Sequence, residues 1–401
     1  MIKKIVTWNV MACALWATTV CGQNAGGAAA PANPPAAAGV LPPANLQAVP
    51  TATQTNSPAA PAAPTIGLMD AFAGKFLIGT AGDLPRGYSA AELANIKANY
   101  NVITPENGMK PQSTHPSENQ YTFGTGDALV QWCADNKIKV WGHNLAWHAQ
   151  TPGWFFQGTN GEAVTRELAM ARLSNHIHTV VGHFKGKLIG WDVVNEAIND
   201  RGDWQTENLR NSPWVRAIGP DYLTYAFKWA HEADPDAQLY YNDYNIEQGA
   251  VRDTGKHSSS MLLLKRLIKD GAPINGVGIQ GHWHLDTSLA DVEKAITDYE
   301  SLGLKVGISE LDVTVTGENS GAFPTAGGGG PVTADAFQKQ ADVYGKLFGI
   351  FDRHANVVTR VTLWGISDRR SWRPTQRPLV FDGQLQPKPA LQAILDVAKG
   401  K

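Results

Sequence analysis

From residue 65 to its C-terminus the chain alternates short apolar runs with helical patterns. The apolar runs lie at residues 76–79, 102–104, 139–142, 188–194, 238–241, 276–280, 305–309 and 361–365, and each is typical of a parallel strand buried on both faces. Helical patterns lie between them at 91–100, 163–184, 222–233, 261–269, 291–302, 334–351 and 389–398. Eight such alternations predict one α/β domain, residues 65–401, folded as a (β/α)8 TIM barrel. A nucleotide-binding fold is disfavoured because no glycine-rich phosphate loop follows any run.

The first 64 residues have a different character. Lys3 and Lys4 precede an apolar stretch and then small residues, a pattern typical of a signal peptide covering residues 1–22 and too short for a membrane span. Residues 23–64 are almost entirely Ala, Pro, Gly, Asn and Thr, which predicts a disordered low-complexity linker. We therefore expect a secreted protein, extracellular or periplasmic, without a transmembrane segment. Lipid attachment at Cys21 is the alternative, which Val20 before it disfavours.

Charge and cysteine content narrow the possible partners. The chain has 34 basic and 36 acidic residues and no long run of either sign, so nucleic acid is not an expected ligand. Its 13 Trp residues suit core packing and also stacking on sugar faces. Cys133 is the only cysteine after the predicted leader, and its position in a helical pattern predicts a place in the core. We expect an independently folding monomer.

Polar residues follow most of the predicted strands, at the end of a barrel where catalytic groups lie. Seven strand ends are involved, at residues 105–110, 142–148, 195–196, 242–245, 280–284, 310–312 and 364–368. A metal-dependent hydrolase is one hypothesis, because His282 and His284 have the spacing of a metal-binding pair. It is disfavoured because the first strand carries no second pair and the other ends are rich in amides and Trp.

Glycoside hydrolysis requires two carboxyl groups flanking one bond, one protonated and one ionised. Glu196 and Glu310 follow the fourth and seventh predicted strands, so they face each other across the barrel mouth. Two carboxyls placed near each other do not ionise equally easily, which lets one of them act as an acid. A salt bridge is the alternative for either glutamate alone. A non-catalytic sugar-binding or inhibitor barrel is disfavoured because both glutamates are present.

The motifs around these glutamates resemble those of glycoside hydrolase family 10, the endo-β-1,4-xylanases. They are Trp-Asp-Val-Val-Asn-Glu at 191–196 and Ile-Ser-Glu-Leu-Asp at 308–312, with Thr-Pro-Glu-Asn at 104–107, Gly-His-Asn-Leu-Ala-Trp-His-Ala-Gln at 142–150 and Tyr-Asn-Asp-Tyr-Asn at 241–245. The resemblance implies cleavage of internal xylan bonds with net retention, Glu196 as acid/base and Glu310 as nucleophile, without cofactor or metal. A related β-glucanase or cellulase is the alternative enzyme.

Spacing supports two helpers of the nucleophile. Glu310 and Asp312 are two apart on a strand and share a face, as do Gln280 and His282 on the neighbouring strand. An imidazole at His282 that bridges Asp312 and Glu310 would keep the nucleophile ionised. Asn195 is assigned on resemblance alone, because regular alternation would point it away from Glu196 unless the strand leaves its pleat there.

The resemblance also implies a set of sugar-binding residues: Glu106, Asn107, Lys110, His143, Trp147, Gln150, Asn195, Tyr241, Gln280, Trp364 and Trp372. Because xylose lacks an exocyclic hydroxymethyl group, close aromatic walls would favour xylan over glucan. Two features depart from a minimal barrel. Residues 316–332 lengthen the loop after the nucleophile strand. The arginines of 368–373 either bind acidic xylan branches or pair with local carboxylates, and we favour the second.

Overall fold

The computed structural model describes residues 66–158, 162–316 and 332–401. The predicted signal peptide, the whole of the predicted linker and most of the 316–332 loop therefore lie outside the described residues. Within the described ranges, no helix is both long and apolar enough to span a membrane.

The strands of the described residues form one closed parallel barrel. They are β1 (Leu77–Ala81), β2 (Val102–Thr104), β3 (Lys139–Trp147), β4 (Gly190–Asn195), β5 (Gln238–Asp243), β6 (Gly276–Ile279), β7 (His282–His284), β8 (Lys305–Thr314) and β9 (Val358–Leu363). Neighbours pair in sequence order, β9 pairs with β1, and β8 pairs with both β6 and β7. The short strands β6 and β7 share one barrel position, because the chain turns at Gly281 with φ +77°. The predicted (β/α)8 fold is confirmed.

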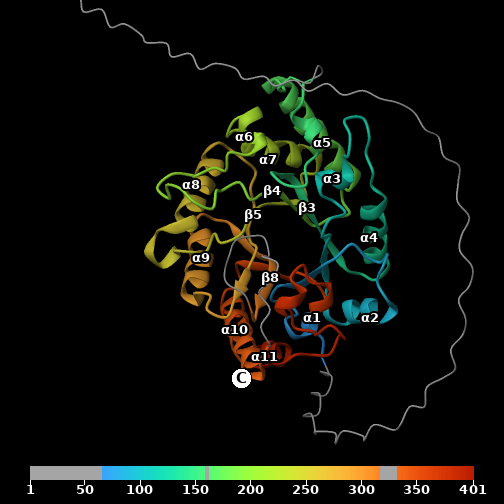
Figure 1. Ribbon diagram of the computed structural model, residues 1–401, viewed down its shortest axis with the longest axis vertical. Helices are drawn as coiled ribbons and strands as arrows, with labels where there is room; N and C mark the ends of the chain where they lie inside the picture. Colours follow the sequence, from blue (N-terminus) through green and yellow to red (C-terminus); the bar gives the residue numbers. More distant parts are fainter. Residues whose placement is uncertain (1–65, 159–161, 317–331) are drawn as a thin grey trace, which may run out of the picture. The chain divides into compact units, whose positions relative to one another are not determined.

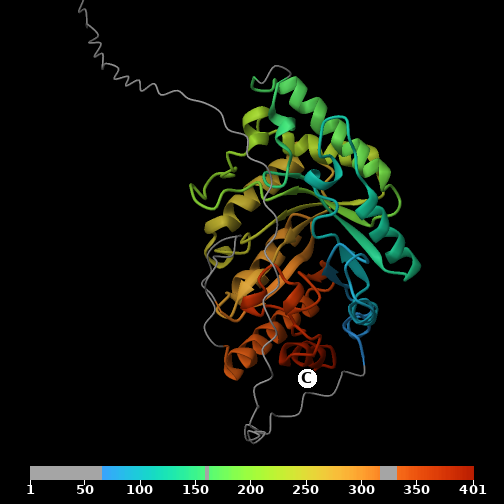
Figure 2. The same ribbon diagram turned by 45° about the vertical axis from the view of Figure 1, so that its right-hand side comes forward.

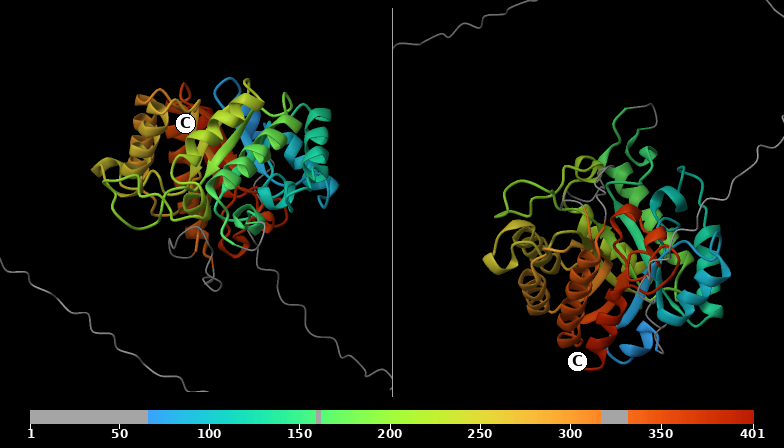
Figure 3. Two further views of the ribbon diagram at one scale, coloured as in Figure 1. Left: turned by 90° about the horizontal axis from the view of Figure 1, so that it is seen from above. Right: turned by 60° about the horizontal axis from the view of Figure 1, so that its bottom comes forward.

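Helices cover the outside of the barrel, as the views in Figures 1, 2 and 3 show. The described helices are α1 (Leu68–Ala71), α2 (Ala90–Asn99), α3 (Pro111–Thr114), α4 (Gly124–Asp135), α5 (Arg166–His183), α6 (Pro213–Ala217), α7 (Tyr222–Ala233), α8 (Gly255–Lys269), α9 (Leu289–Ser301), α10 (Ala334–Arg353) and α11 (Pro389–Ala398). Short 3-10 turns are η1 (Gly153–Phe156), η2 (Ala250–Arg252), η3 (Asp368–Arg370) and η4 (Pro374–Gln376). The predicted helices are all present. The helical pattern expected around Cys133 corresponds to α4, whose bounds were not predicted.

The barrel interior contains aromatic rings and the buried ion pair of Arg360 and Asp192. Trp141 on β3 and Tyr240 on β5 pack edge to face with centroids 4.8 Å apart, and Gly190 and Gly276 leave room for them. The guanidinium of Arg360 on β9 lies 3.9 Å from the centroid of the Trp141 ring and donates to Asp192 at 3.2 Å. Because β3 and β9 are not neighbours, these contacts cross the barrel.

Two local predictions concern single side chains. Cys133 is fully buried, and burial raises the pKa of its thiol to about 12, so its predicted core position is confirmed. Arg369 and Arg370 both donate to Glu92, at 3.0 and 2.8 Å, as the local-pairing hypothesis predicted. The hydrogen bond from Arg370 lowers the pKa of Glu92 to about 2 against the opposing effect of burial. The η3 turn is thereby tied to α2.

Helix α2 begins with a capping box formed by Ser89 and Glu92, which we expect to contribute to the free energy of unfolding. The Ser89 hydroxyl accepts from the Glu92 backbone N–H at 3.2 Å, and the Glu92 carboxylate accepts from the Ser89 N–H at 2.7 Å. We expect Ser89→Ala to lower the free energy of unfolding by about 1 kcal/mol, since it leaves a helix N–H without its partner. Denaturant unfolding followed by circular dichroism measures this. Ser301→Ala, in the last turn of α9, is the control; equal effects would contradict the prediction.

Candidate active site

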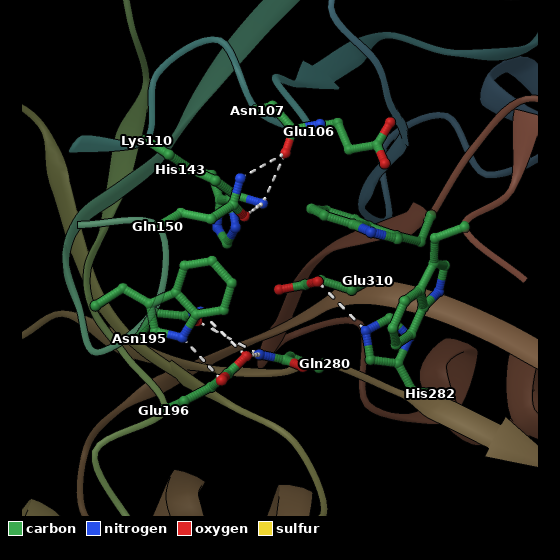
Figure 4. Close-up of a pocket in the computed structure, with 13 residues that line it drawn as sticks. Glu106, Asn107, Lys110, His143, Gln150, Asn195, Glu196, Gln280, His282 and Glu310 are labelled. Atoms are coloured by element: carbon green, nitrogen blue, oxygen red, sulfur yellow. Dashed lines mark hydrogen bonds and ion pairs between the residues drawn. The ribbon is translucent and has the colours of Figure 1, made fainter. Parts of the chain in front are cut away.

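A cleft at the carboxyl ends of the strands brings together nearly all the predicted site residues. It is lined by Glu106, Asn107, Lys110, His143, Trp147, Gln150, Asn195, Glu196, Gln280, His282, Glu310, Trp364 and Trp372. These residues come from strands and loops all around the barrel mouth. Figure 4 shows Glu310 in the middle, with His282 on one side and Glu196 with Gln280 on another. The two carboxyl groups face the same space.

Glu310 lies within β8, which continues to Thr314 beyond the predicted strand end. Its side chain is buried, and one oxygen accepts from the Asn242 amide at 2.8 Å while the other lies 3.3 Å from His282 Nε2. Burial alone would raise the pKa of this carboxyl. The contacts with His282, together with the nearby His143 and the Asn242 amide, outweigh burial and lower the pKa of Glu310 to about 2. Glu310 is therefore ionised at neutral pH.

His282 bridges the two carboxylates as its spacing predicted. Its Nδ1 lies 2.9 Å from Asp312 Oδ2, and the indole of Trp372 donates to the same oxygen at 2.8 Å. Burial disfavours a charged imidazole, but Asp312 and Glu310 outweigh it and raise the pKa of His282 to about 9. The imidazole is thus a cation at neutral pH, and it both fixes the Glu310 rotamer and stabilises its charge.

Removing this cation should shift the acidic side of the pH profile. Glu310 cannot attack once protonated, and without the His282 charge its pKa rises from about 2, so activity is lost at a higher pH. We expect His282→Gln to move the acidic limb of kcat/KM upward by at least about one pH unit and to reduce kcat/KM at neutral pH. His284→Gln is the control, because His284 pairs with Asp286. A profile that does not move in His282→Gln would contradict this role.

Glu196 follows β4 in a backbone conformation that takes it out of the strand. Its φ is +56°, in the left-handed region that residues other than glycine rarely adopt. This departure turns both Asn195 and Glu196 into the cleft, which regular alternation would prevent. Glu196 Oε2 accepts from the Trp147 indole at 2.8 Å, and Oε1 accepts from the amides of Gln280 and Asn195 at 3.0 and 3.2 Å.

A chain of side-chain amides connects the two carboxyl groups. Gln280 donates to Glu196, Asn195 accepts from Asn242 at 2.8 Å, and Asn242 also donates to Glu310. The Ser309 hydroxyl donates to the Asn242 carbonyl oxygen at 2.6 Å and so fixes its orientation. Asn242 was not among the predicted site residues, although it begins one of the polar strand ends. The alternation of β5 could have identified it, because Tyr240 and Asn242 share the inward face.

The structure does not bring Tyr241 to the cleft, which corrects its predicted role in sugar binding. Tyr241 is fully buried on the opposite face of β5 from Asn242, and its hydroxyl donates to Asp243 and accepts from the Ala197 N–H at 3.2 Å. The one-residue difference follows from the two-residue period of a strand. Tyr241 instead supports the backbone directly after Glu196.

One corner of the cleft is a polar cluster around Lys110. The ammonium group donates to Gln150 at 2.8 Å and to Asn107 at 3.2 Å, and lies 5.0 Å from the centroid of the Trp147 ring. Lys110 is largely buried, and burial lowers its pKa. Beside it, burial raises the pKa of Glu106 and Asp83 adds to the effect. This corner offers several hydrogen-bond donors and acceptors to a neutral polar ligand.

Indole rings form another wall of the cleft. Trp364 packs edge-on against His143, with centroids 5.4 Å apart, and His143 Nδ1 lies 3.0 Å from Asp192 Oδ2 inside the barrel. The centroids of the Trp372 and His282 rings lie 4.8 Å apart. The guanidinium of Arg373 lies over the Trp372 ring, 4.2 Å from its centroid. Flat apolar surfaces beside amides and carboxylates suit a sugar ring, which presents both C–H faces and hydroxyls.

Residues 67–397 match the family model described as Glycosyl hydrolase family 10. The chain belongs to this family. Endo-1,4-beta-xylanase A of Thermoanaerobacterium saccharolyticum is 38% identical over 342 residues, which are 83% of this chain and 28% of that protein. Exoglucanase XynX of Acetivibrio thermocellus is 38% identical over 342 residues, 83% of this chain and 29% of that protein. The chain thus spans under a third of the length of these two relatives.

Solved structures of family 10 proteins agree with the barrel and its extent. The crystal structure of xylanase XynB from Paenibacillus barcinonensis, complexed with a conduramine derivative, is similar with a TM-score of 0.74 at 37% identity. The similarity covers 82% of this chain and 98% of that one.

The metal-site hypothesis raised by His282 and His284 is not supported by the contacts of His282. Both ring nitrogens of His282 contact carboxylates, so the two histidines are not arranged as a metal-binding pair. Among the described residues, no group of three or more His, Cys, Asp or Glu side chains is arranged to hold a metal ion.

Proposed function

We propose that this protein hydrolyses internal β-1,4 bonds of xylan with net retention of anomeric configuration. The observation that carries the proposal is the pair of carboxyls in one cleft with unlike surroundings. Glu310 is held ionised by a charged imidazole, whereas Glu196 accepts only from neutral indole and amide groups. Family 10 membership and the names of the relatives support xylan as substrate.

In the first step Glu310 attacks the anomeric carbon while Glu196 donates a proton to the departing glycosidic oxygen. The sugar–oxygen bond breaks, a bond to a Glu310 oxygen forms, and the leaving chain carries the proton away. His282 keeps Glu310 ionised before attack. The Asn195 amide oxygen accepts from Asn242, and we expect the Asn195 side chain to hydrogen-bond a sugar hydroxyl beside the reacting carbon, as the family resemblance implies.

In the second step Glu196, now ionised, removes a proton from a water molecule that attacks the same carbon. The bond to Glu310 breaks and its carboxylate is restored. Two inversions give net retention. Proton NMR of the first-formed reducing ends tests this directly, since a retaining enzyme initially releases the β-anomer; initial release of the α-anomer would contradict the mechanism.

A β-1,4-glucan is the second candidate substrate, because one relative is named an exoglucanase. The two substrates differ by a hydroxymethyl group on each ring. The indoles of Trp364 and Trp372 lie close to His143 and His282, so we expect steric selection against that group. Reducing-sugar release from xylan and from carboxymethyl cellulose, measured at the same enzyme concentration, separates the candidates. Faster release from the cellulose derivative would overturn the xylanase assignment.

We infer that the protein is exported and acts as a monomer on a neutral polysaccharide. The leader pattern at residues 1–22 supports export, and the low charge imbalance fits a neutral substrate. Mass measurement of the mature N-terminus tests processing, and a lipid-modified Cys21 would replace secretion by anchoring. Light scattering tests the monomer.

A further inference from the structure

The turn that carries Glu196 is held by hydrogen bonds to its backbone N–H and carbonyl groups. Its N–H groups have partners on β5: Glu196 donates to the Asn242 carbonyl at 2.8 Å, Ala197 to the Tyr241 hydroxyl, and Ile198 to Asp243 at 3.3 Å. Because Glu196 has a positive φ, this conformation persists only where neighbours enforce it. The position of the carboxyl therefore depends on what holds the turn.

The carbonyl groups of the same three residues all accept from one arginine. Arg210 Nε donates to the Glu196 carbonyl at 3.3 Å, its backbone N–H to that of Ala197 at 2.7 Å, and Nη2 to that of Ile198 at 3.2 Å. The planar guanidinium presents its donors in a rigid fork, so one side chain holds two of these carbonyls in a fixed geometry. We call Arg210 and the three carbonyls the carbonyl clamp.

The guanidinium is itself fixed from its other side. Nη1 lies 3.3 Å from Asp200, and Nη2 donates to the Tyr244 hydroxyl at 3.0 Å, while that hydroxyl donates to Asp200. Lys256 lies 2.9 Å from Asp243 and over the Tyr244 ring, at 3.6 Å from its centroid. The clamp is thus part of a network of opposite charges next to the catalytic turn.

We propose that Arg210 is a positioning residue for proton transfer by Glu196, acting through the backbone carbonyls of residues 196 and 198. This inference rests on the proposed function. It assigns to Arg210 an effect on departure of the leaving group and none on attack by Glu310, since Arg210 has no contact with Glu310, His282 or Asp312 among the described residues.

Leaving groups of different acidity separate positioning from a general structural role. A dinitrophenyl group departs without a proton, whereas phenol and xylose need one, so a displaced acid slows only the second kind. General acid catalysis contributes about 10²–10⁴-fold, so we expect Arg210→Met to lower kcat/KM about 10-fold or more on phenyl β-xylobioside and less than about 3-fold on the dinitrophenyl analogue. The measurement uses the full chain. The quantity compared between variants is the ratio of kcat/KM on phenyl β-xylobioside to kcat/KM on the dinitrophenyl analogue.

Further variants decide between geometry, charge and stability. Arg210→Lys keeps the charge but lacks the fork, so we expect it to lower the ratio as well; a ratio restored to the wild-type value would overturn the clamp. Arg266→Met is the matched control. Arg266 lies on α8 and pairs at 2.6 Å with Glu207, which is in the same loop as Arg210, and Arg266 does not touch residues 196–198. We expect an unchanged ratio in that variant, and a similar fall would overturn the proposal.

If Arg210→Met does not fold, Asp200→Asn tests the same idea. The Asp200 side chain is 47% exposed, so its replacement should spare the fold while loosening the guanidinium. We expect a smaller fall of the same ratio, and equal losses on both substrates would overturn the proposal. A wild-type protein that cleaves neither aryl xylobioside nor xylan would instead refute the proposed function itself.

Discussion

Glu310→Ala is expected to lower kcat on xylan by at least about 10⁴-fold, because it removes the group that forms the covalent intermediate. The loss should not be explained by unfolding. Glu310 makes its contacts with His282 and Asn242 inside a cleft, so the variant leaves a space at the site and not in the apolar core. Reducing-sugar release from xylan, together with the melting temperature, measures both effects.

A small anion provides the decisive control for Glu310→Ala. Azide can enter the space left by the carboxylate and displace an activated dinitrophenyl group from the same face, which would give the inverted glycosyl azide. Glu106→Gln is the matched variant, since Glu106 lines the same cleft without contacting His282 in the described structure. More than about 1% residual activity on xylan in Glu310→Ala would contradict the assignment of the nucleophile.

Glu196→Ala is expected to lower kcat on xylan by about 10²–10⁴-fold, the usual contribution of a general acid and base. On dinitrophenyl β-xylobioside its kcat/KM should stay close to the wild-type value, because that leaving group needs no proton. Deglycosylation still needs a base, so a burst of dinitrophenolate followed by slow turnover should appear in stopped-flow absorbance.

The two alanine variants control each other. Azide should accelerate the second step of Glu196→Ala and give a product that retains the β-configuration, because it attacks the Glu310 ester from the face that water would use. Finding the burst and the β-azide in Glu310→Ala instead would exchange the two roles. Such a result would also remove the basis for the carbonyl clamp at Arg210.

Sequence patterns were sufficient for the fold because buried parallel strands are continuous apolar runs. The eight runs correspond to the eight barrel positions, and the errors lie at strand ends: β3 continues to Trp147, and β8 continues past Glu310 to Thr314. There the residues turn polar, since they point into the cleft, and the apolar signal stops before the strand does. The predicted strand ends were nevertheless the right places to look for the site.

The site was less completely predictable, and Tyr241 and Asn242 show why. Both residues belong to the Tyr-Asn-Asp-Tyr-Asn motif at 241–245. Only Asn242 faces the cleft, where its amide donates to Glu310 and to Asn195. Arg210 lies 14 residues beyond Glu196 in a loop, and no periodicity relates the two residues. Contacts of this kind arise from how loops return to the barrel mouth, which local patterns do not encode.

The sequence by itself determined three features: the alternation of strands and helices, the two strand-end glutamates, and the shared face of Glu310 and Asp312. Each of them follows from a short pattern that repeats along the chain. Only the tertiary structure decided the left-handed conformation at Glu196, the charged state that His282 confers on Glu310, and the carbonyl clamp. Those features depend on burial and on groups brought together from distant parts of the chain, and their energies exist only once the barrel is closed.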